Sequence, residues 1–276
     1  MGKIVIISEN SLPGKVGGIY AENGFSAYIE KDDHRFIFDV GPAGISVTNN
    51  APRLGINLRS LSGIILSHGH MDHTGGLPAL LRATGKIKVY AHPEVFKDRY
   101  SFQEGRYIYV GMPYKKEALE GMGADFDLSS SWREIAPGVF LTGEIPRKSK
   151  SEKGDPNLKV KINKEFVVDE VRDDQALVIE TSASVIVISG CGHAGTINTL
   201  EYVKNKLNRK INIFIGGTHL EYAGEEQFNE TVSYLKDAGI EKVGLCHCSG
   251  LKAGSALISK LEGRAFFCPV GSIITI

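Results

Sequence analysis

The chain has 276 residues, of which 42% are hydrophobic and 23% are charged. That length can bury one large core or two smaller ones, and the composition is that of an ordinary soluble globular protein. Lys+Arg and Asp+Glu number 32 each, so no overall electrostatic field draws the chain to nucleic acid or to an anionic membrane.

The first residues, 1–9, contain too short an apolar run for a signal peptide and predict a first strand. The most apolar later run, 185–188, is also only strand length, and nothing approaches a transmembrane span. Cys191, Cys246, Cys248 and Cys268 all lie in the C-terminal third. Without a secretory signal, we expect a cytoplasmic protein with reduced thiols and no membrane partner.

Apolar runs bounded by turn residues alternate with segments of helical period along the chain. The predicted strands are 4–7, 26–30, 35–38, 64–66, 88–91, 139–142, 176–180, 185–189, 211–215, 242–245, 265–268 and 272–275. The predicted helices are 196–208, 225–238 and 251–261. Hairpins dominate early and strands alternate with helices later, so we expect one α/β domain over 1–276, with two sheets packed together and helices outside. Composition alone does not separate this layout from another α/β arrangement.

The segment Ser67-His-Gly-His-Met-Asp-His-Thr-Gly-Gly76 follows the apolar run 63–66 directly. Three histidines and one carboxylate therefore fall within six residues, where a buried strand ends and a helix should begin. Imidazole nitrogen and carboxylate oxygen are ligands that suit Zn²⁺, Fe or Mn²⁺. The spacing predicts a metal site.

Four apolar strands each lead into a loop that carries a histidine: His68, His193, His219 and His247. In α/β folds, ligands bind at the carboxyl ends of strands. The alternative is that each histidine only hydrogen-bonds its own loop. The sequence favours a shared site because four such loops recur.

The segment 147–164 contains seven Lys or Arg residues against two acids, with Gly154 and Pro156 among them. One interpretation is a solvated, flexible basic loop. The other is a lid that meets an anionic substrate, since clustered cations attract phosphate.

The His-x-His-x-Asp-His pattern of residues 68–73 resembles the signature of the metallo-β-lactamase superfamily, whose members are mostly metal-dependent hydrolases. Phe38-Asp39-Val40-Gly41 and the run from Lys236 to His247 resemble further motifs of that superfamily. The segments 24–30, 66–77, 142–147, 173–179, 190–195 and 246–250 resemble the subgroup named for 7,8-dihydropterin-6-methyl-4-(β-D-ribofuranosyl)aminobenzene-5′-phosphate synthase. The resemblance implies a four-layer αββα sandwich with two mixed sheets and helices outside.

The resemblance also implies a binuclear centre of two divalent metal ions, with zinc preferred and iron or manganese as alternatives. His68 and His70 would hold one metal, Asp72 and His73 the other, and His247 would join the second. Asp39 would support the loop from behind the ligands. The chain departs from the family pattern at two places: Thr142-Gly143-Glu144 stands where a third histidine is usual, and Gly190-Cys191 where a bridging Asp is usual.

For the third ligand of the first metal, His193 is the preferred candidate and Glu144 the alternative. Cys191 could ligate or bridge as a thiolate, or could simply be a small buried residue. His219 is expected to be a substrate or supporting group.

A bimetallic site would supply hydroxide near neutral pH, and Asp72 could carry the proton. Three features favour an anionic, phosphorylated small substrate. Ser249 and Gly250 stand at one predicted helix start and 190–196 at another, where backbone N–H groups can bind a phosphate, and Arg147 supplies positive charge. Gly-Ser helix starts are also common caps.

The expected function is a metal-dependent hydrolase of a small phosphorylated or anionic molecule. One alternative is a transferase that joins a pterin methyl pyrophosphate to a ribofuranosylaminobenzene phosphate. Another is a non-catalytic metal-bound ligand sensor. Balanced charge argues against a nuclease, and a homo-oligomer is compatible with the sequence.

Overall fold

The computed structural model describes residues 2–14 and 17–276, and its chain divides into two compact units. The first unit comprises the described residues up to Ser129 together with Pro156–Asp169 and Pro269–Ile276. The second comprises Ser130–Asp155 and Glu170–Cys268. The single domain expected over 1–276 stays a prediction.

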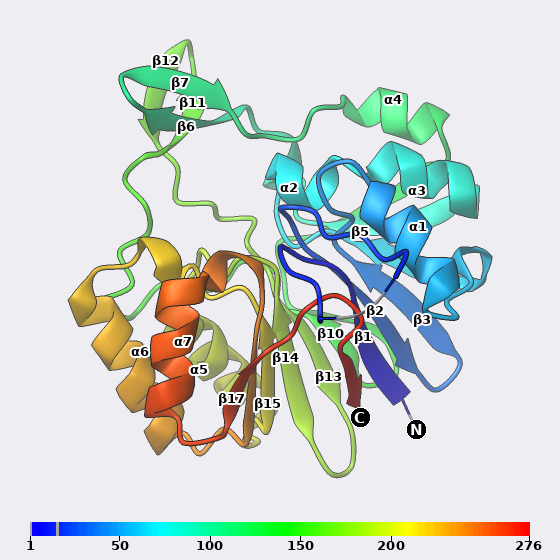
Figure 1. Ribbon diagram of the computed structural model, residues 1–276. Helices are drawn as coiled ribbons and strands as arrows, with labels where there is room; N and C mark the ends of the chain where they lie inside the picture. The colour runs from blue at the N-terminus through cyan, green and yellow to red at the C-terminus, as the bar shows by residue number, and fades with distance from the viewer. Residues whose placement is uncertain (1, 15–16) are drawn as a thin grey trace. The chain divides into compact units, whose positions relative to one another are not determined.

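The first unit is built on a seven-stranded mixed sheet in the order β18-β1-β2-β3-β4-β5-β8 (Figure 1). The strands β18, β1, β2 and β3 pair antiparallel, and β3, β4, β5 and β8 pair parallel. The strand bounds are β1 Gly2–Ser8, β2 Ser26–Lys31, β3 His34–Phe38, β4 Gly63–Ile65, β5 Ile87–Ala91, β8 Ala124–Leu128 and β18 Ile273–Thr275. The parallel half of this sheet therefore places the ends of β3 and β4 side by side.

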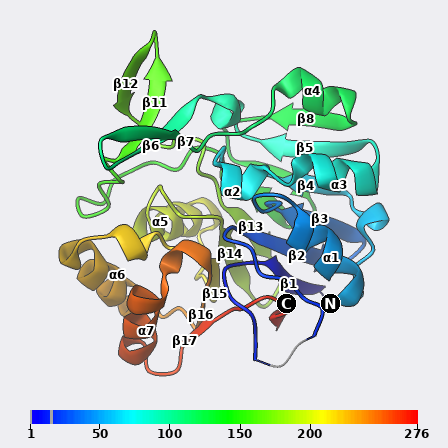
Figure 2. The same ribbon diagram turned by 45° about the horizontal axis from the view of Figure 1, so that its top comes forward.

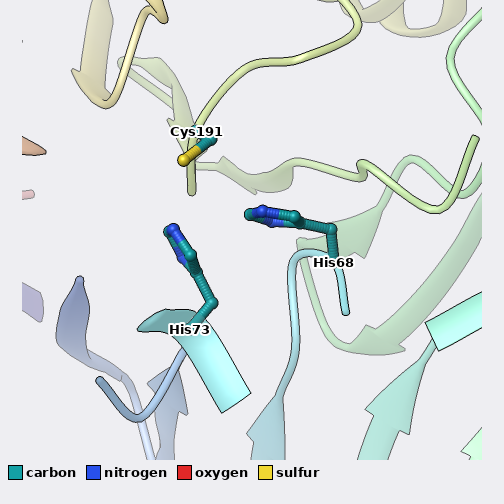
Figure 3. Close-up of side chains that lie close together, drawn as sticks. All are labelled: His68, His73 and Cys191. Carbon is teal, nitrogen blue, oxygen red and sulfur yellow. The ribbon is translucent and has the colours of Figure 1, made fainter. Parts of the chain in front are cut away.

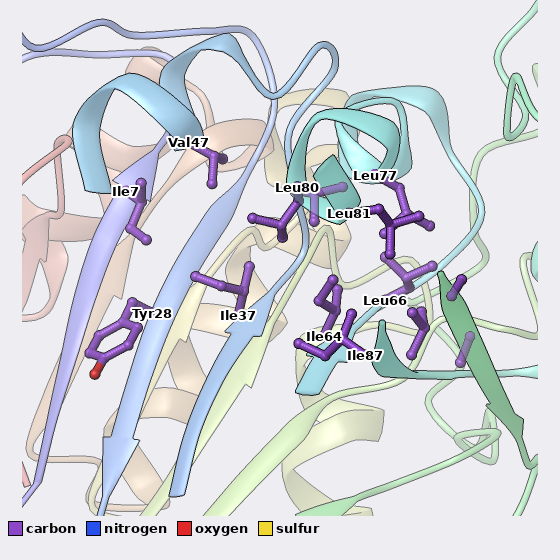
Figure 4. Packing of buried hydrophobic residues seen from close by; sticks show 14 of the residues in the cluster. Ile7, Tyr28, Ile37, Val47, Ile64, Leu66, Leu77, Leu80, Leu81 and Ile87 are labelled. Atoms are coloured by element: carbon purple, nitrogen blue, oxygen red, sulfur yellow. The ribbon is translucent and has the colours of Figure 1, made fainter. Parts of the chain in front are cut away.

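The helices α1 (Ile45–Arg53) and α3 (Leu77–Thr84) pack on this sheet and bury its apolar side chains (Figure 4). In α3, Leu77, Leu80 and Leu81 recur at helical spacing and are fully buried. Pro78 occupies the first turn, where its missing N–H costs nothing, and the helix ends at Gly85 with φ 78°. A short helix α4 (Lys116–Gly121) precedes β8.

A second, four-stranded antiparallel sheet in the first unit joins two hairpins that lie side by side (Figure 2). Its order is β12-β11-β6-β7, with β6 Arg99–Gln103, β7 Arg106–Tyr109, β11 Leu158–Ile162 and β12 Glu165–Val168. Arg99 is buried, and its Nε donates to Asp169 Oδ2 at 2.8 Å. Strand β11 lies within the basic segment 147–164, so that part of the segment is paired sheet rather than loop.

The second unit contains a seven-stranded mixed sheet in the order β17-β16-β15-β14-β13-β10-β9. The strands β14 to β17 are parallel, and β9, β10, β13 and β14 pair antiparallel. The strand bounds are β9 Arg133–Ala136, β10 Val139–Leu141, β13 Leu177–Glu180, β14 Val185–Ser189, β15 Ile213–Gly216, β16 Lys242–Leu245 and β17 Ala265–Phe267. The loops after β14, β15 and β16 therefore emerge at one edge of the sheet.

Three helices pack against this sheet: α5 (Thr196–Leu207), α6 (Glu225–Asp237) and α7 (Leu251–Lys260) (Figure 1). Leu200, Leu235 and Leu257 are fully buried, one from each helix. Every strand and helix expected from the sequence is present, within one to two residues at most ends. Across residues 2–14 and 17–276, the structure contains no helix with both the length and the apolar character needed to cross a membrane.

Candidate metal centre

The histidine loop begins where β4 ends in the first unit. Asp39 directly follows the neighbouring parallel strand β3, with φ 60°. After His70 the chain makes one helical turn, α2 (Met71–Thr74). This turn is too short to supply a substantial dipole, so the loop side chains must carry the chemistry.

Asp39 is fully buried and accepts three hydrogen bonds from the loop. Ser67 donates to it twice, from its backbone N–H and from its hydroxyl, each at 2.7 Å. His73 Nδ1 lies 2.7 Å from the second carboxylate oxygen. Because each bond to a buried carboxylate is charge-assisted, Asp39 holds both ends of the loop in place.

These bonds fix the tautomers of two histidines. A carboxylate only accepts, so His73 must carry its proton on Nδ1 and keeps a lone pair on Nε2. The single hydroxyl proton of Ser67 goes to Asp39, so the 2.9 Å contact between Ser67 Oγ and His68 Nδ1 requires His68 to donate. Both imidazoles are thereby left with an Nε2 lone pair, the arrangement that second-layer carboxylates produce in metal sites.

The ligand-type atoms of the loop lie close together. His68 Nε2 is 3.0 Å from His70 Nδ1, and the rings of His68 and His73 have centroids 4.3 Å apart (Figure 3). Asp72 Oδ2 lies 3.8 Å from His73 Nε2, and the Asp72 side chain is 35% exposed. Two imidazole nitrogens on one tetrahedral ion are separated by roughly 3.3 Å, so the loop fits a divalent metal.

Backbone contacts explain why two glycines follow the ligands. A side chain at Gly75 would place its Cβ 2.0 Å from Pro42 O, and one at Gly76 would place it 2.0 Å from Val40 O. The turn after His73 therefore packs directly on the chain that follows Asp39.

In the second unit, the loops after β14, β15 and β16 carry a separate group of ligand-type side chains. One ligand atom each of Cys191, His219 and Cys248 lies within 4.8 Å of the others. The His219 ring lies between those of His193 and Tyr222 in tilted contacts, with centroid distances of 4.3 and 4.9 Å. Cys191, also drawn in Figure 3, is buried, as is Cys248.

The thiol and imidazole of this group perturb each other. Burial opposes the thiolate of Cys248, but its interactions with Cys191 and His219 and the charges of His247 and His219 outweigh burial, so the pKa of Cys248 is well below its usual range. Burial also opposes the imidazolium of His219, yet the interaction with Cys248 raises the pKa of His219. The Cys248 thiol also donates to the carbonyl of Cys191, at 3.2 Å.

The loop 190–196 was expected to offer free backbone N–H groups to a substrate phosphate. The structure instead fills that helix start with the carboxylate of Glu152, which accepts from the backbone N–H groups of Ile197 at 2.8 Å and Asn198 at 2.9 Å. Burial raises the pKa of Glu152 to about 7 despite these bonds. The anion at this helix N-terminus is thus supplied by the chain itself.

Asp174 is a second buried carboxylate in the same unit. It accepts from the backbone N–H of Ala194 at 2.7 Å, and burial raises its pKa to about 7. Asp174 therefore tethers the loop that carries His193.

The remaining predicted residues of the second unit have the following positions. Arg147 donates to the carbonyls of His193, at 2.6 Å, and Glu170, so it braces the His193 loop. Glu144 is exposed and lines a cavity of about 280 Å³ together with Arg147. Ser249 is buried, and its hydroxyl accepts from Thr218 at 3.1 Å. Gly250, with φ 67°, precedes α7.

Substrate contacts for Arg147, His219, Ser249 and Gly250 stay predictions. So do the ligand roles of Cys191, Glu144, His193 and His247 beside the histidine loop, and the role of Asp72 as proton carrier.

Sequence reasoning missed Ser67, Glu152, Asp174 and Cys248 as functional residues. Ser67 could have been found because a hydroxyl between an expected supporting carboxylate and a ligand is a natural relay. Cys248 lies next to His247 and could have been grouped with Cys191. Glu152 and Asp174 carry no local signal, because their role depends on the distant loop that each contacts.

Comparison with known proteins identifies the family. The model of the metallo-beta-lactamase superfamily matches residues 19–206. The chain is 32% identical over 271 residues to the 7,8-dihydropterin-6-methyl-4-(beta-D-ribofuranosyl)-aminobenzene-5'-phosphate synthase of Methanocaldococcus jannaschii, covering 94% of this chain and 92% of that one. It is 35% identical over 260 residues to the protein MJ0448 of the same organism, covering 93% and 94%.

Among solved structures, Tm1679, described as a metal-dependent hydrolase of the beta-lactamase superfamily, matches with a TM-score of 0.86 and 26% identity, covering 100% of this chain and 99% of that one. This likeness confirms the predicted αββα metallo-β-lactamase fold class. The expected resemblance to the synthase subgroup is also confirmed. The chain therefore belongs to the metallo-β-lactamase superfamily.

Proposed function

We propose that this protein is a metal-dependent hydrolase acting on a small phosphorylated or otherwise anionic molecule. The observation that carries the proposal is the Asp39 network, which fixes the tautomers of His68 and His73 so that the Nε2 of each bears a lone pair. A buried carboxylate that orients two imidazoles is the supporting arrangement of metal sites.

His68, His70, Asp72 and His73 would hold the metal, with zinc preferred for this nitrogen and oxygen set and iron or manganese as alternatives. The superfamily pattern adds His193 and His247. When bound, such ions lower the pKa of a coordinated water and polarise a phosphoryl oxygen.

The protein's own side chains would then orient the metal ligands and transfer a proton. Asp39 and Ser67 keep His68 and His73 in the ligating tautomer throughout the reaction. The Asp72 carboxylate, one-third exposed, can pass a proton between the reacting centre and solvent. We infer a phosphorylated substrate because the relative named as a synthase has a product that carries a 5′-phosphate.

The test is turnover of phosphate mono- and diesters by the metal-analysed protein in H₂¹⁸O. Hydrolysis predicts one ¹⁸O in the released phosphate and loss of activity after chelation. Turnover that survives complete metal removal, or phosphate without ¹⁸O, would refute metal-dependent hydrolysis.

A transferase is the second candidate, and the 32% identity to the synthase over most of both chains favours it. The reaction would join an amine or carbon nucleophile of a ribofuranosylaminobenzene phosphate to a pterin methyl group, with pyrophosphate leaving. Acceptor-dependent pyrophosphate release without ¹⁸O incorporation would establish transfer. Equal release with and without the acceptor would exclude it.

A further inference from the structure

The second unit holds a compact set of two thiols and one imidazole. Ligand atoms of Cys191, His219 and Cys248 all lie within 4.8 Å of one another. Around one tetrahedral zinc ion, with bonds of about 2.0–2.3 Å, ligand atoms are separated by roughly 3.4–3.8 Å. The three side chains would need only small rotations to surround a cation.

The imidazole of His219 is placed for such a role. Both of its ring nitrogens are buried, and its one polar contact of note is with the Cys248 thiol, a second ligand-type group. Tilted ring contacts with His193 and Tyr222 pack the imidazole on both sides. A buried polar group that protein atoms leave unsatisfied calls for an ion or a water.

The three side chains of the cluster come from loops of adjacent strands in one sheet. Cys191, His219 and Cys248 follow β14, β15 and β16, which are neighbouring parallel strands. His219 is held in the left-handed region, with φ 54°, at a cost that folded proteins tolerate mainly at functional sites. A Cβ on Gly217 would lie 2.6 Å from Cys248 Sγ, so the glycine keeps the space open.

We propose that Cys191, His219 and Cys248 form a binding site for a thiophilic divalent cation, zinc being the expected one. Two thiolates and one imidazole form a soft set that selects zinc over magnesium, calcium or manganese. Binding would release the thiol protons to solvent. This inference does not rest on the proposed hydrolase function.

Space for a fourth ligand adjoins the cluster. A cavity of about 20 Å³ is lined by His219, Gly192 and His193, among others. That volume holds about one water molecule. A water there, next to His219, would be a candidate fourth ligand beside the three protein ligands.

The experiment is a Co²⁺ titration of the reduced, metal-free full-length protein. Co²⁺ occupies zinc sites and gives a near-ultraviolet charge-transfer band only when a thiolate binds it. We expect the band to appear in the parent protein and to fall at least twofold in both Cys191→Ser and Cys248→Ser.

Three variants serve as controls. Cys246→Ser and Cys268→Ser each remove a buried thiol that belongs to no metal-capable cluster of the described residues, and both should keep the full band. The double variant His68→Ala/His70→Ala removes two ligands of the histidine loop and should also keep it. Failure of the hydrolase proposal would leave these results unchanged.

Two outcomes would overturn the site. One is a parent protein that binds Co²⁺ without a charge-transfer band, which needs no variant to interpret. The other is a band lost in His68→Ala/His70→Ala but retained in Cys248→Ser, which would assign the sulfur of Cys191 to the loop metals instead. Circular dichroism of each variant verifies that it is folded.

Discussion

The two units use the same strand geometry to present different donor atoms. In the first, parallel strands β3 and β4 end in Asp39 and the histidine loop, which offers nitrogen and oxygen. In the second, parallel strands β14, β15 and β16 end in loops that offer sulfur and nitrogen. A shared edge of a sheet gathers ligands, and the residue types alone set the metal preference.

The units also hold their donors in place differently. The first relies on a buried carboxylate whose three hydrogen bonds orient the loop. The second packs His219 between the tilted rings of His193 and Tyr222, and Arg147 and Asp174 brace the His193 loop through backbone hydrogen bonds. The first arrangement is therefore sensitive to a single isosteric change, while the second distributes its support.

The roles of the two units can be distinguished most clearly by removing metal-binding side chains from one of them. In His68→Ala/His70→Ala, we expect complete loss of the loop metal and of activity, because two of the imidazole ligands are gone. Metal content measured on purified protein tests this, with His34→Ala as the control outside the loop. Unchanged metal content would show that the loop is not the metal centre.

The dependence on one carboxylate can be tested by Asp39→Asn. The amide cannot accept all three hydrogen bonds and its N–H₂ opposes the donors, so the His73 tautomer is no longer fixed. We expect metal affinity to fall by about 10–100-fold. Competition with a chromogenic chelator measures the affinity, and Asp33→Asn, on an exposed turn, is the matched control. An affinity equal to that of the parent would contradict the role of Asp39.

The buried carboxylate of Glu152 makes the second unit pH-sensitive. Its pKa is raised from 4.5 to about 7, so the folded chain holds this proton more tightly than the unfolded chain does. The contribution of Glu152 to the free energy of unfolding is therefore complete below about pH 4.5 and is lost as the pH rises through about 7.

Glu152→Gln removes the titrating carboxyl group. The free energy of unfolding of the variant should therefore exceed that of the parent by up to about 3 kcal/mol at pH 8 and by little at pH 4.5. Urea unfolding at several pH values measures the difference. Glu226→Gln, exposed and paired with Lys153 at 3.6 Å, is the control and should show no such trend. If the free energies of unfolding of Glu152→Gln and the parent differed by the same amount at every pH, Glu152 would not be a buried group that titrates near pH 7.

The smallest expected effect concerns Ser249, predicted from the sequence to bind substrate. Its buried hydroxyl accepts from Thr218 and donates to Gly216 O at 3.3 Å, so Ser249→Ala should cost about 1 kcal/mol of stability. Thermal unfolding without any substrate checks this, with exposed Ser255→Ala as the control. No loss of stability would favour a purely substrate-binding hydroxyl.

The sequence was sufficient for the elements with strong periodicity. The buried strands 185–189 and 242–245 are mostly apolar, and the three C-terminal helices carry apolar side chains at helical spacing. It was not sufficient for β6, β7, β11 and β12, which are short and mostly exposed. The pairing of β6 with β11 joins distant segments, such as Ser101 with Leu158, and no local pattern encodes it.

For the site, the sequence by itself determined which side chains can bind metal, because ligand type and spacing are local properties of residues 68–73. Only the tertiary structure decided which ring nitrogen of His68 and His73 bears the lone pair. Asp39 lies 28 residues before Ser67, and their hydrogen bonds fix the tautomers. Likewise, Glu152 takes the helix N-terminus that the sequence left to a phosphate. Hydrogen bonds and burial between distant segments set protonation, and those contacts exist only in the folded chain.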